Sequence, residues 1–289
     1  MPEASVESIR RKFNRISTLP PLPRTATQLL SVLGDPEVDI DEIAVIIEQD
    51  PALVARILGL ANSAYFGQAK AITGVRQAII RVLGINLVKS LALSISLAGV
   101  FDTKACRGFN VAEYWYTALG SASLARMIVQ HSPVLKNGAA DQAYLAALLH
   151  NLGMLLLASI SPEEMSQALE RHRQDPGLDL LGIERECLGV DHFAAGEWLL
   201  QRWHLPDVVV EVVGHLGDVV YQGVYLGEWS SVRTAVEFVT FESAGDAVAF
   251  PANNSVARVL ELDEILCDEI TQRYSAQTEA LRAVAQVLE

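Results

Sequence analysis

The sequence predicts an all-α protein made of many short, closely connected helices. Apolar residues recur at the three- and four-residue spacing of a helix through most of the chain. Capping residues, prolines and glycines interrupt that pattern at short intervals. No segment of residues 1–215 alternates between apolar and polar residues for long enough to predict a strand. These three observations favour two packed helical lobes.

The first part of the chain predicts an amphipathic helix followed by a series of core helices. The amphipathic helix spans residues 6–16, and the proline-rich residues 19–23 then favour an extended backbone. Further helices are predicted over residues 25–33, 41–49, 51–61, 75–83 and 86–100. Asp39 and Asp50 are positioned to cap two of these helices, and Gly84 is positioned to end another. We expect residues 1–105 to form an N-terminal helical lobe.

The second part of the chain predicts a larger lobe, which we expect to span residues 106–289. The polar residues 101–110 mark the boundary between the lobes. Helices are predicted over residues 111–130, 141–161, 163–173, 183–203, 208–216, 232–239 and 256–288. Glycines make residues 217–230 irregular. Residues 228–289 carry 11 acidic and 4 basic side chains, which predicts acidic C-terminal helices.

Residues 141–161 are predicted to form one buried central helix, in which His150 and Asn151 interrupt an otherwise apolar run. Asp141 is positioned to cap this helix, and Ser161 begins a capping box for the next one. A helix that is apolar on every face belongs inside a protein or in a bilayer. The polar pair and Gly153 favour the protein interior, and we expect no uninterrupted run of bilayer length.

Net charge, cysteine content and the first residues of the chain indicate the class of protein and its compartment. The net charge of -13 disfavours a surface that coats nucleic acid, because phosphate binding needs clustered Lys and Arg. The 3 cysteines form no CxxC pair, which indicates a reducing compartment and no thiol-held metal. The first residues lack the apolar core of a signal peptide. We therefore expect a soluble, cytoplasmic protein that binds no membrane.

Histidines are the remaining candidates for chemistry, since the sequence lacks nucleotide-loop, zincin, EF-hand and hydrolase-elbow motifs. His150, His192 and His215 each lie on or beside an apolar helix. Three imidazoles from three helices can hold a transition metal, but buried histidines satisfied by hydrogen bonds are more frequent. His172 lies among charged residues and is expected to face solvent.

Several motifs in a fixed order resemble the HDOD family. They include LPPLP at residues 19–23, ANSAYF at residues 61–66, AALLHNLGMLLL at residues 146–157 and DHFAAGEWLLQRWHLP at residues 191–206. HDOD domains are bacterial output domains related to the HD phosphohydrolases, and the resemblance covers about residues 18–216. It implies a single HDOD-type unit over residues 1–289, an HD-domain-like second lobe and a regulatory role in signal transduction.

The resemblance also implies where an HD-type site would lie. HD hydrolases hold one or two metals with histidines, a His-Asp pair and a late acid. The corresponding positions in this sequence are Thr117, His150, Asn151, His192, His215 and Glu237. Thr117 replaces a histidine, and Asn151 offers a neutral oxygen where a carboxylate would bridge two cations. We expect a degenerate pocket with no metal and no cofactor, and a GYP signature is missing after His215.

Two main functional hypotheses follow. The first is a non-catalytic regulatory module that binds a signalling protein or a small ligand, through the degenerate pocket or a groove between the lobes. The alternative is a metal-dependent phosphohydrolase or phosphodiesterase acting on a nucleotide or cyclic dinucleotide, with His150, His192 and His215 as ligands. A nucleic-acid binder acting through basic residues 10–15 is a third hypothesis, which the net charge opposes. The sequence leaves the oligomeric state open.

Overall fold

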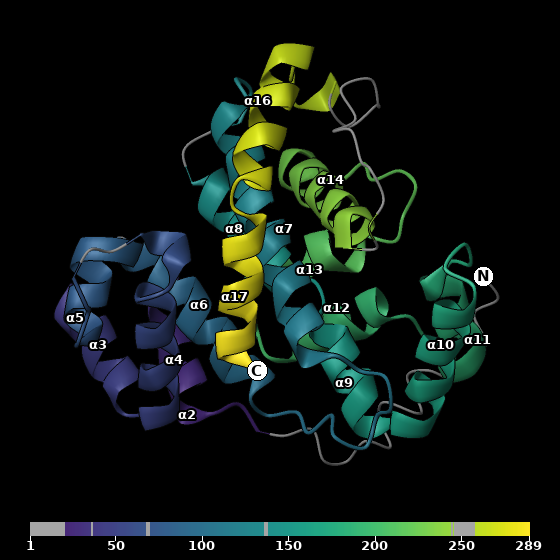
Figure 1. Cartoon of the computed structure of the whole chain (residues 1–289), viewed down its shortest axis with the longest axis horizontal. Coiled ribbons are helices and arrows are strands. Elements are labelled where there is room, and N and C mark those ends of the chain that lie inside the picture. The colour runs from purple at the N-terminus through teal and green to yellow at the C-terminus, as the bar shows by residue number, and fades with distance from the viewer. Residues whose placement is uncertain (1–20, 36, 68–69, 136–137, 244, 246–257) are drawn as a thin grey trace.

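Every regular element in the computed structural model of the chain is a helix, within the residues that the structure describes (Figure 1). These are residues 21–35, 37–67, 70–135, 138–243, 245 and 258–289. The predicted all-α fold is therefore confirmed for them. The predicted helix over residues 6–16 and the start of the proline-rich segment lie outside the described residues.

The first group of helices, on the left in Figure 1, is formed by residues 24–98. It comprises α2 (Arg24–Val32), α3 (Ile40–Glu48), α4 (Pro51–Ala61), the 3-10 turn η1 (Ala64–Phe66), α5 (Val75–Ala78), the π-helical turn η2 (Ile79–Leu83) and α6 (Ile85–Ala98). Asp39 and Asp50 cap α3 and α4 with their side chains, as predicted. Gly84 follows η2 with a φ of 77°, a conformation that glycine adopts at little cost.

The second group is built around the long helix α7 (Val111–His131), which packs against α8, α14 and α17. Its elements are α8 (Ala139–Leu149), α9 (Leu152–Ile160), α10 (Pro162–Gln174), α11 (Leu180–Leu188), α12 (His192–Arg202), α13 (Asp207–Gly214), α14 (Leu226–Ser243), α16 (Glu264–Ser275) and α17 (Thr278–Leu288). Small residues in the middle of α7, including Gly120 and Ala122, let its neighbours approach closely.

The prediction of one continuous central helix is wrong. α8 ends at Leu149 and α9 begins at Leu152, so His150 and Asn151 occupy a break between two helices. α8 also begins earlier than predicted, after Gly138. Asp141 therefore does not cap it, and instead accepts a hydrogen bond from Asn86 Nδ2 at 2.8 Å. The polar pair thus marks an interruption of the helix within an apolar run.

Other sequence predictions also differ from the structure, including the irregular segment over residues 217–230, because α14 begins within it at Leu226. The run predicted over residues 183–203 is two helices, because Asp191 caps a new helix, α12, after the left-handed Gly189 that ends α11. Described residues 258–288 likewise hold two helices, α16 and α17. Ser161 precedes Pro162 at the start of α10, but its side chain makes no capping hydrogen bond there.

One segment, Ala139–Ile160, is long and apolar enough to span a membrane by length and composition alone. This differs from the expectation that no run would reach that length. The segment is interrupted by the break at His150 and Asn151, and 83% of its most apolar window is buried inside the protein. Burial of this kind is also typical of a core helix, so the segment is weak support for a membrane span.

The C-terminal helix α17 connects the two groups. It contacts α7 in the second group and α4 and η1 in the first, and it runs between them in Figure 1. Leu281, Val284, Ala285 and Leu288 form its buried face. α6 and α8 make a second contact between the groups. The two parts of the chain thus share an apolar interface made by helices far apart in sequence.

Candidate functional site

A close crossing of α9 and α12 brings the two buried histidines to one place. Gly153 stands three residues after His150, and Gly196 stands four residues after His192. A Cβ atom on Gly153 would lie 2.6 Å from the backbone nitrogen of Gly196, which is closer than real Cβ atoms approach other atoms. Only glycine permits this approach. The crossing therefore places the break after α8 and the first turn of α12 beside one another.

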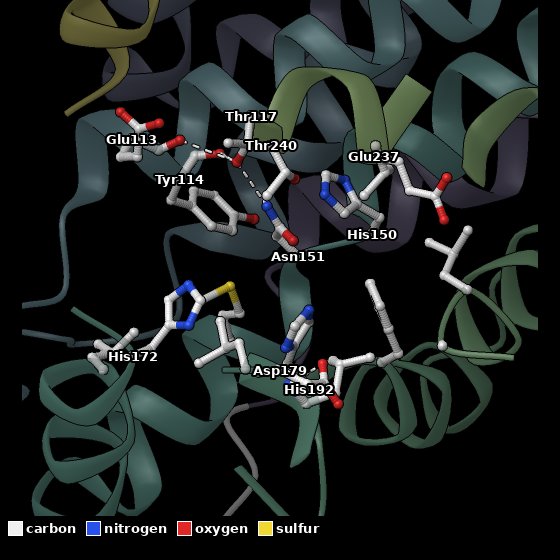
Figure 2. A pocket seen from close by; sticks show the side chains of 18 of the residues that line it. Glu113, Tyr114, Thr117, His150, Asn151, His172, Asp179, His192, Glu237 and Thr240 are labelled. Carbon is white, nitrogen blue, oxygen red and sulfur yellow. Dashed lines mark hydrogen bonds between the residues drawn. The ribbon is translucent and has the colours of Figure 1, made fainter. Parts of the chain in front are cut away.

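The two histidines line a cavity of about 710 Å³, which is within the usual size of a small-molecule site. α7, the α8–α9 break, α11, α12 and α14 contribute most of its walls. Most of the wall is apolar, and its aromatic members are Phe109, Tyr114, Phe193 and Phe241. Figure 2 shows the polar residues that reach this space. Thr117, His150, Asn151, His192 and Glu237, expected to share a pocket, all line it.

Thr117 and Asn151 are hydrogen-bonded to each other across the cavity wall. Asn151 Nδ2 donates to Thr117 Oγ1 at 2.8 Å, as the dashed line in Figure 2 shows. Thr117 in turn donates its single hydroxyl proton to the backbone oxygens of Glu113 and Tyr114, at 3.1 and 3.0 Å. The two residues that replace metal ligands of HD hydrolases therefore satisfy one another.

His150 is a neutral imidazole with a fixed tautomer. Its Nδ1 lies 2.6 Å from the carbonyl oxygen of Ala147, and because a carbonyl oxygen only accepts, Nδ1 carries the proton. Burial lowers the pKa of His150 to about 3; the bond to Ala147 partly opposes this shift, and the charge of nearby His192 adds to it. Nε2 is therefore an acceptor.

His192 is paired with a fully buried carboxylate. Glu184 Oε2 accepts from both the Nδ1 and the backbone nitrogen of His192, at 2.7 and 2.9 Å. Burial alone would lower the pKa of His192, but the charge and hydrogen bond of Glu184 raise it, and the net shift is upward. Arg185 binds Asp191 beside this pair, at 2.7 Å. The pair keeps a proton on Nδ1 and favours a second one on Nε2.

Three other residues differ from what the sequence suggested. His215 does not line the cavity; its ring is 42% exposed and Nδ1 lies 2.7 Å from Asp218. Glu237 lines the cavity but accepts from Arg233 at 2.8 Å instead of facing the histidines as a free acid. His172 is half-buried on the cavity wall, with Nδ1 3.0 Å from the oxygen of Leu178, and is not simply solvent-facing.

Two important side chains were missed by the reasoning from sequence. Glu184 was not singled out within the helix predicted over residues 183–203, yet it lies four residues from both Leu180 and Leu188. That spacing puts it on the apolar stripe of α11 and would have identified it as buried. Tyr114 was assigned no role in the pocket. Its hydroxyl makes no hydrogen bond within the described part of the chain, and the ring lines the cavity.

The residues of the cavity do not fit a metal centre. No group of three or more His, Cys, Asp or Glu side chains within the described ranges is arranged to hold a metal ion. His150 and His192 each have only Nε2 available as a ligand, and Asn151 uses its amide nitrogen on Thr117. A carboxamide brings no charge to balance a cation. The donor atoms of this cavity therefore differ from those of an HD metal site in both number and charge.

A second cavity, of about 500 Å³, lies where α2 and α6 meet α8 and α13. It corresponds to the groove expected between the lobes. Its buried cation is Lys89, whose Nζ donates to the backbone oxygens of Leu33 and Val32 at 3.2 and 3.5 Å. Lys89 thus caps the end of α2, and a structural role accounts for it.

Comparison with known proteins identifies the family. The family model described as "HDOD domain" matches residues 19–218. An uncharacterized protein of Treponema pallidum (strain Nichols) is 31% identical over 211 residues, which are 69% of this chain and 38% of that protein. The chain therefore spans less than half the length of this curated relative.

Solved structures share the fold. An HDOD domain protein with unknown function from Geobacter sulfurreducens has a TM-score of 0.81 at 24% identity, and the alignment covers 99% of both chains. A protein of Marinobacter aquaeolei VT8, provisionally named a signal transduction protein, gives a TM-score of 0.85 at 24% identity over 99% of this chain and 66% of that one. A provisionally named phosphohydrolase of Shewanella amazonensis SB2B gives 0.75 at 19% identity, covering 99% of this chain and 98% of that one.

Proposed function

The chain belongs to the HDOD domain family, and from this premise we propose that it is a non-catalytic signal-transduction module that binds a small ligand in the cavity. Binding there changes the packing of α9, α11, α12 and α14, whose residues form the walls. A signalling protein that contacts these helices then distinguishes the bound from the free state. In this proposal the cavity is a sensor site and not an active site.

The hydrogen bond between Asn151 and Thr117 carries the proposal. In a metal-dependent HD site the residues at both positions would coordinate metal ions. In this cavity the amide nitrogen of Asn151 donates to the hydroxyl of Thr117, which in turn donates to the backbone of α7. A site of this kind lacks an obvious means of generating a hydroxide nucleophile at neutral pH.

The cavity itself supports ligand binding. It combines apolar walls with a few converging polar atoms, the usual construction of a small-molecule site. Its polar side chains are held by protein partners rather than left mobile: Ala147 fixes His150, Glu184 fixes His192 and Thr117 fixes Asn151. A fixed arrangement lowers the entropy cost of binding, which favours recognition of a particular ligand.

Two measurements test the proposed function together. We expect no hydrolysis of bis(p-nitrophenyl) phosphate, nucleoside triphosphates or cyclic dinucleotides in the presence of Mn²⁺ above the rate of His150→Phe. We also expect thermal-shift screening of a metabolite collection to find a compound that stabilises the wild type but not His150→Phe. A His150-dependent rate would contradict the non-catalytic role. A screen in which no compound stabilises the wild type would contradict the sensor role.

A further inference from the structure

Four buried side chains each leave one polar atom toward the cavity. Tyr114, His150, Asn151 and His192 are at most 7% exposed, and all four line the cavity. Within the residues that the structure describes, no hydrogen bond reaches Tyr114 Oη, His150 Nε2, Asn151 Oδ1 or His192 Nε2. These atoms face the cavity and are open to hydrogen bonds from whatever occupies it, so they indicate where the polar groups of a ligand would lie.

The amide of Asn151 is fixed in one orientation. Thr117 has a single hydroxyl proton, and two backbone oxygens of α7 lie where they accept it. Thr117 Oγ1 can therefore only accept from Asn151, which requires the NH2 group to face Thr117. Asn151 Oδ1 is left as an acceptor on the cavity side. Figure 2 shows this side chain next to the hydroxyl of Tyr114.

His150 supplies a second acceptor from the same wall. Its proton is committed to Ala147 on the other side of the ring, so Nε2 presents a lone pair. His150 and Asn151 are consecutive residues at the break between α8 and α9. Two neighbouring acceptors are complementary to a group with two N–H donors. A carboxylate or a sulfate has no proton to give to them.

His192 supplies a donor on a different wall of the cavity. Glu184 keeps Nδ1 protonated, and its negative charge favours the doubly protonated ring, whose Nε2 then donates. A cationic group placed directly against this N–H would be disfavoured. Phe193 lies against both histidines, with its ring centroid 4.2 Å from that of His192 and 6.5 Å from that of His150. This phenyl ring offers an apolar surface for a planar molecule.

We propose that the cavity recognises an uncharged, planar aromatic molecule that carries a primary carboxamide or an equivalent edge of two N–H donors beside an acceptor. The NH2 group donates to His150 Nε2 and Asn151 Oδ1, and the acceptor receives the Nε2 proton of His192. Tyr114 Oη completes the edge, and the aromatic part packs against Phe193. This inference rests on the proposed function, since it names the chemical class of the ligand that the sensor site binds.

A matched pair of probes tests the donor requirement. Naphthalene-2-carboxamide has both N–H donors, whereas N,N-dimethylnaphthalene-2-carboxamide has neither. Ligand-observed NMR titrations of the full-length wild type at pH 7 give a Kd for each. We expect the primary amide to bind about tenfold more tightly or better, because the dimethyl probe leaves two buried acceptors unpaired. Equal binding of the two probes, or binding of neither, would overturn the proposed ligand class.

Single-residue variants test whether His150 and Tyr114 cause the tighter binding of the primary amide. His150→Phe removes the Nε2 acceptor and should abolish the difference in Kd between the two probes. His131→Phe is the matched control, because His131 Nδ1 makes the same type of bond to a backbone oxygen of its own helix, at 2.7 Å, outside the cavity. The His131→Phe variant should keep the full difference in Kd between the two probes. Tyr114→Phe, which loses only the hydroxyl, should reduce primary-amide binding severalfold; an unchanged Kd in Tyr114→Phe would contradict the inference even if His150→Phe does not fold.

The outcome separates this inference from the proposed function. If the metabolite screen finds a His150-dependent ligand but the two naphthalene probes bind equally, the sensor role stands and the ligand class is wrong. If the primary amide binds with the expected preference while a phosphoester is hydrolysed, the ligand class stands and the non-catalytic role is wrong.

Discussion

At the scale of single residues, the pairing of Asn151 with Thr117 distinguishes this cavity from a metal site. The asparagine at this position does more than remove a carboxylate, because its NH2 group donates to Thr117 Oγ1, which accepts from no other group within the described residues. An aspartate at position 151 would place a carboxylate oxygen against Thr117 Oγ1, and neither atom could donate to the other. The effect of a substitution at position 151 therefore depends on the residue at position 117.

Asn151→Asp should destabilise the protein by about 1–3 kcal/mol at pH 7, because the new carboxylate cannot donate to Thr117 and is buried. Urea unfolding of the variant and the wild type measures the loss. Asn86→Asp is the control, since Asn86 makes its bond with Asp141 at the exposed surface. An Asn151→Asp variant as stable as the wild type, or one that gains stability from added Mn²⁺, would refute the role given to this pair.

The neutral state of His150 predicts a pH-dependent contribution to stability. Its pKa falls from an ordinary value of 6.5 to about 3 on folding, so the unfolded chain takes up a proton that the folded protein excludes. The stabilising contribution is complete above pH 6.5 and is lost as the pH falls toward 3. Between pH 7 and pH 5 it should decrease by about 2 kcal/mol.

His150→Phe isolates this effect. The free energy of unfolding of the wild type should fall more steeply between pH 7 and pH 5 than that of the variant, since both keep His192 and the other titrating groups. The pKa of His192 is raised, so its own contribution is present below pH 6.5 and is lost on the alkaline side. Parallel pH profiles for the wild type and His150→Phe would show that His150 is not held neutral.

At the scale of helices, the sequence predicted most elements but not their interruptions. Caps such as Asp39 and Asp50 were recognised because their side chains act on adjacent residues. The break at His150 and Asn151 was missed, since both flanking segments are apolar and helical. The pairing of Glu184 with His192 could not be predicted, because the two residues belong to different helices.

The approach of Gly153 to α12 predicts a severe effect for a small substitution. Gly153→Ala would place a methyl group 2.6 Å from the Gly196 nitrogen and 2.8 Å from the His192 carbonyl carbon, and backbone cannot move away as a side chain can. We expect a loss of about 3 kcal/mol or more. Gly34→Ala, where no atom lies within 4 Å of the new methyl group, should cost far less. Similar unfolding curves for the two variants would contradict the close crossing.

At the scale of the whole molecule, the family resemblance supplied what residue patterns did not. It indicated which distant positions belong to one pocket, and the structure brings five of the six together around the cavity. His215 is the exception, because α13 ends at Gly214 and the ring turns toward Asp218. The contact of α17 with α4 was not visible in the sequence, since an amphipathic helix does not reveal its partner.

Placing an aspartate on the buried face or on the exposed face of α17 tests whether this helix holds the two groups of helices together. Val284 is buried between the two helix groups, whereas Gln286 on the same helix is exposed. Val284→Asp should lower the melting temperature by about 10 °C or more and increase hydrogen exchange in α4 and η1. Gln286→Asp should change neither. If Val284→Asp leaves exchange in α4 unchanged, α17 does not hold the two groups together.

The central claim is that this cavity is organised by protein hydrogen bonds and not by a metal. The most direct measurement is elemental analysis of the untagged protein, combined with thermal melting of the wild type with and without a strong chelator. We predict less than a stoichiometric amount of iron, manganese or zinc and a melting temperature that the chelator leaves unchanged. One equivalent of such a metal, with a chelator-induced fall to the melting temperatures of His150→Ala and His192→Ala, would contradict the claim.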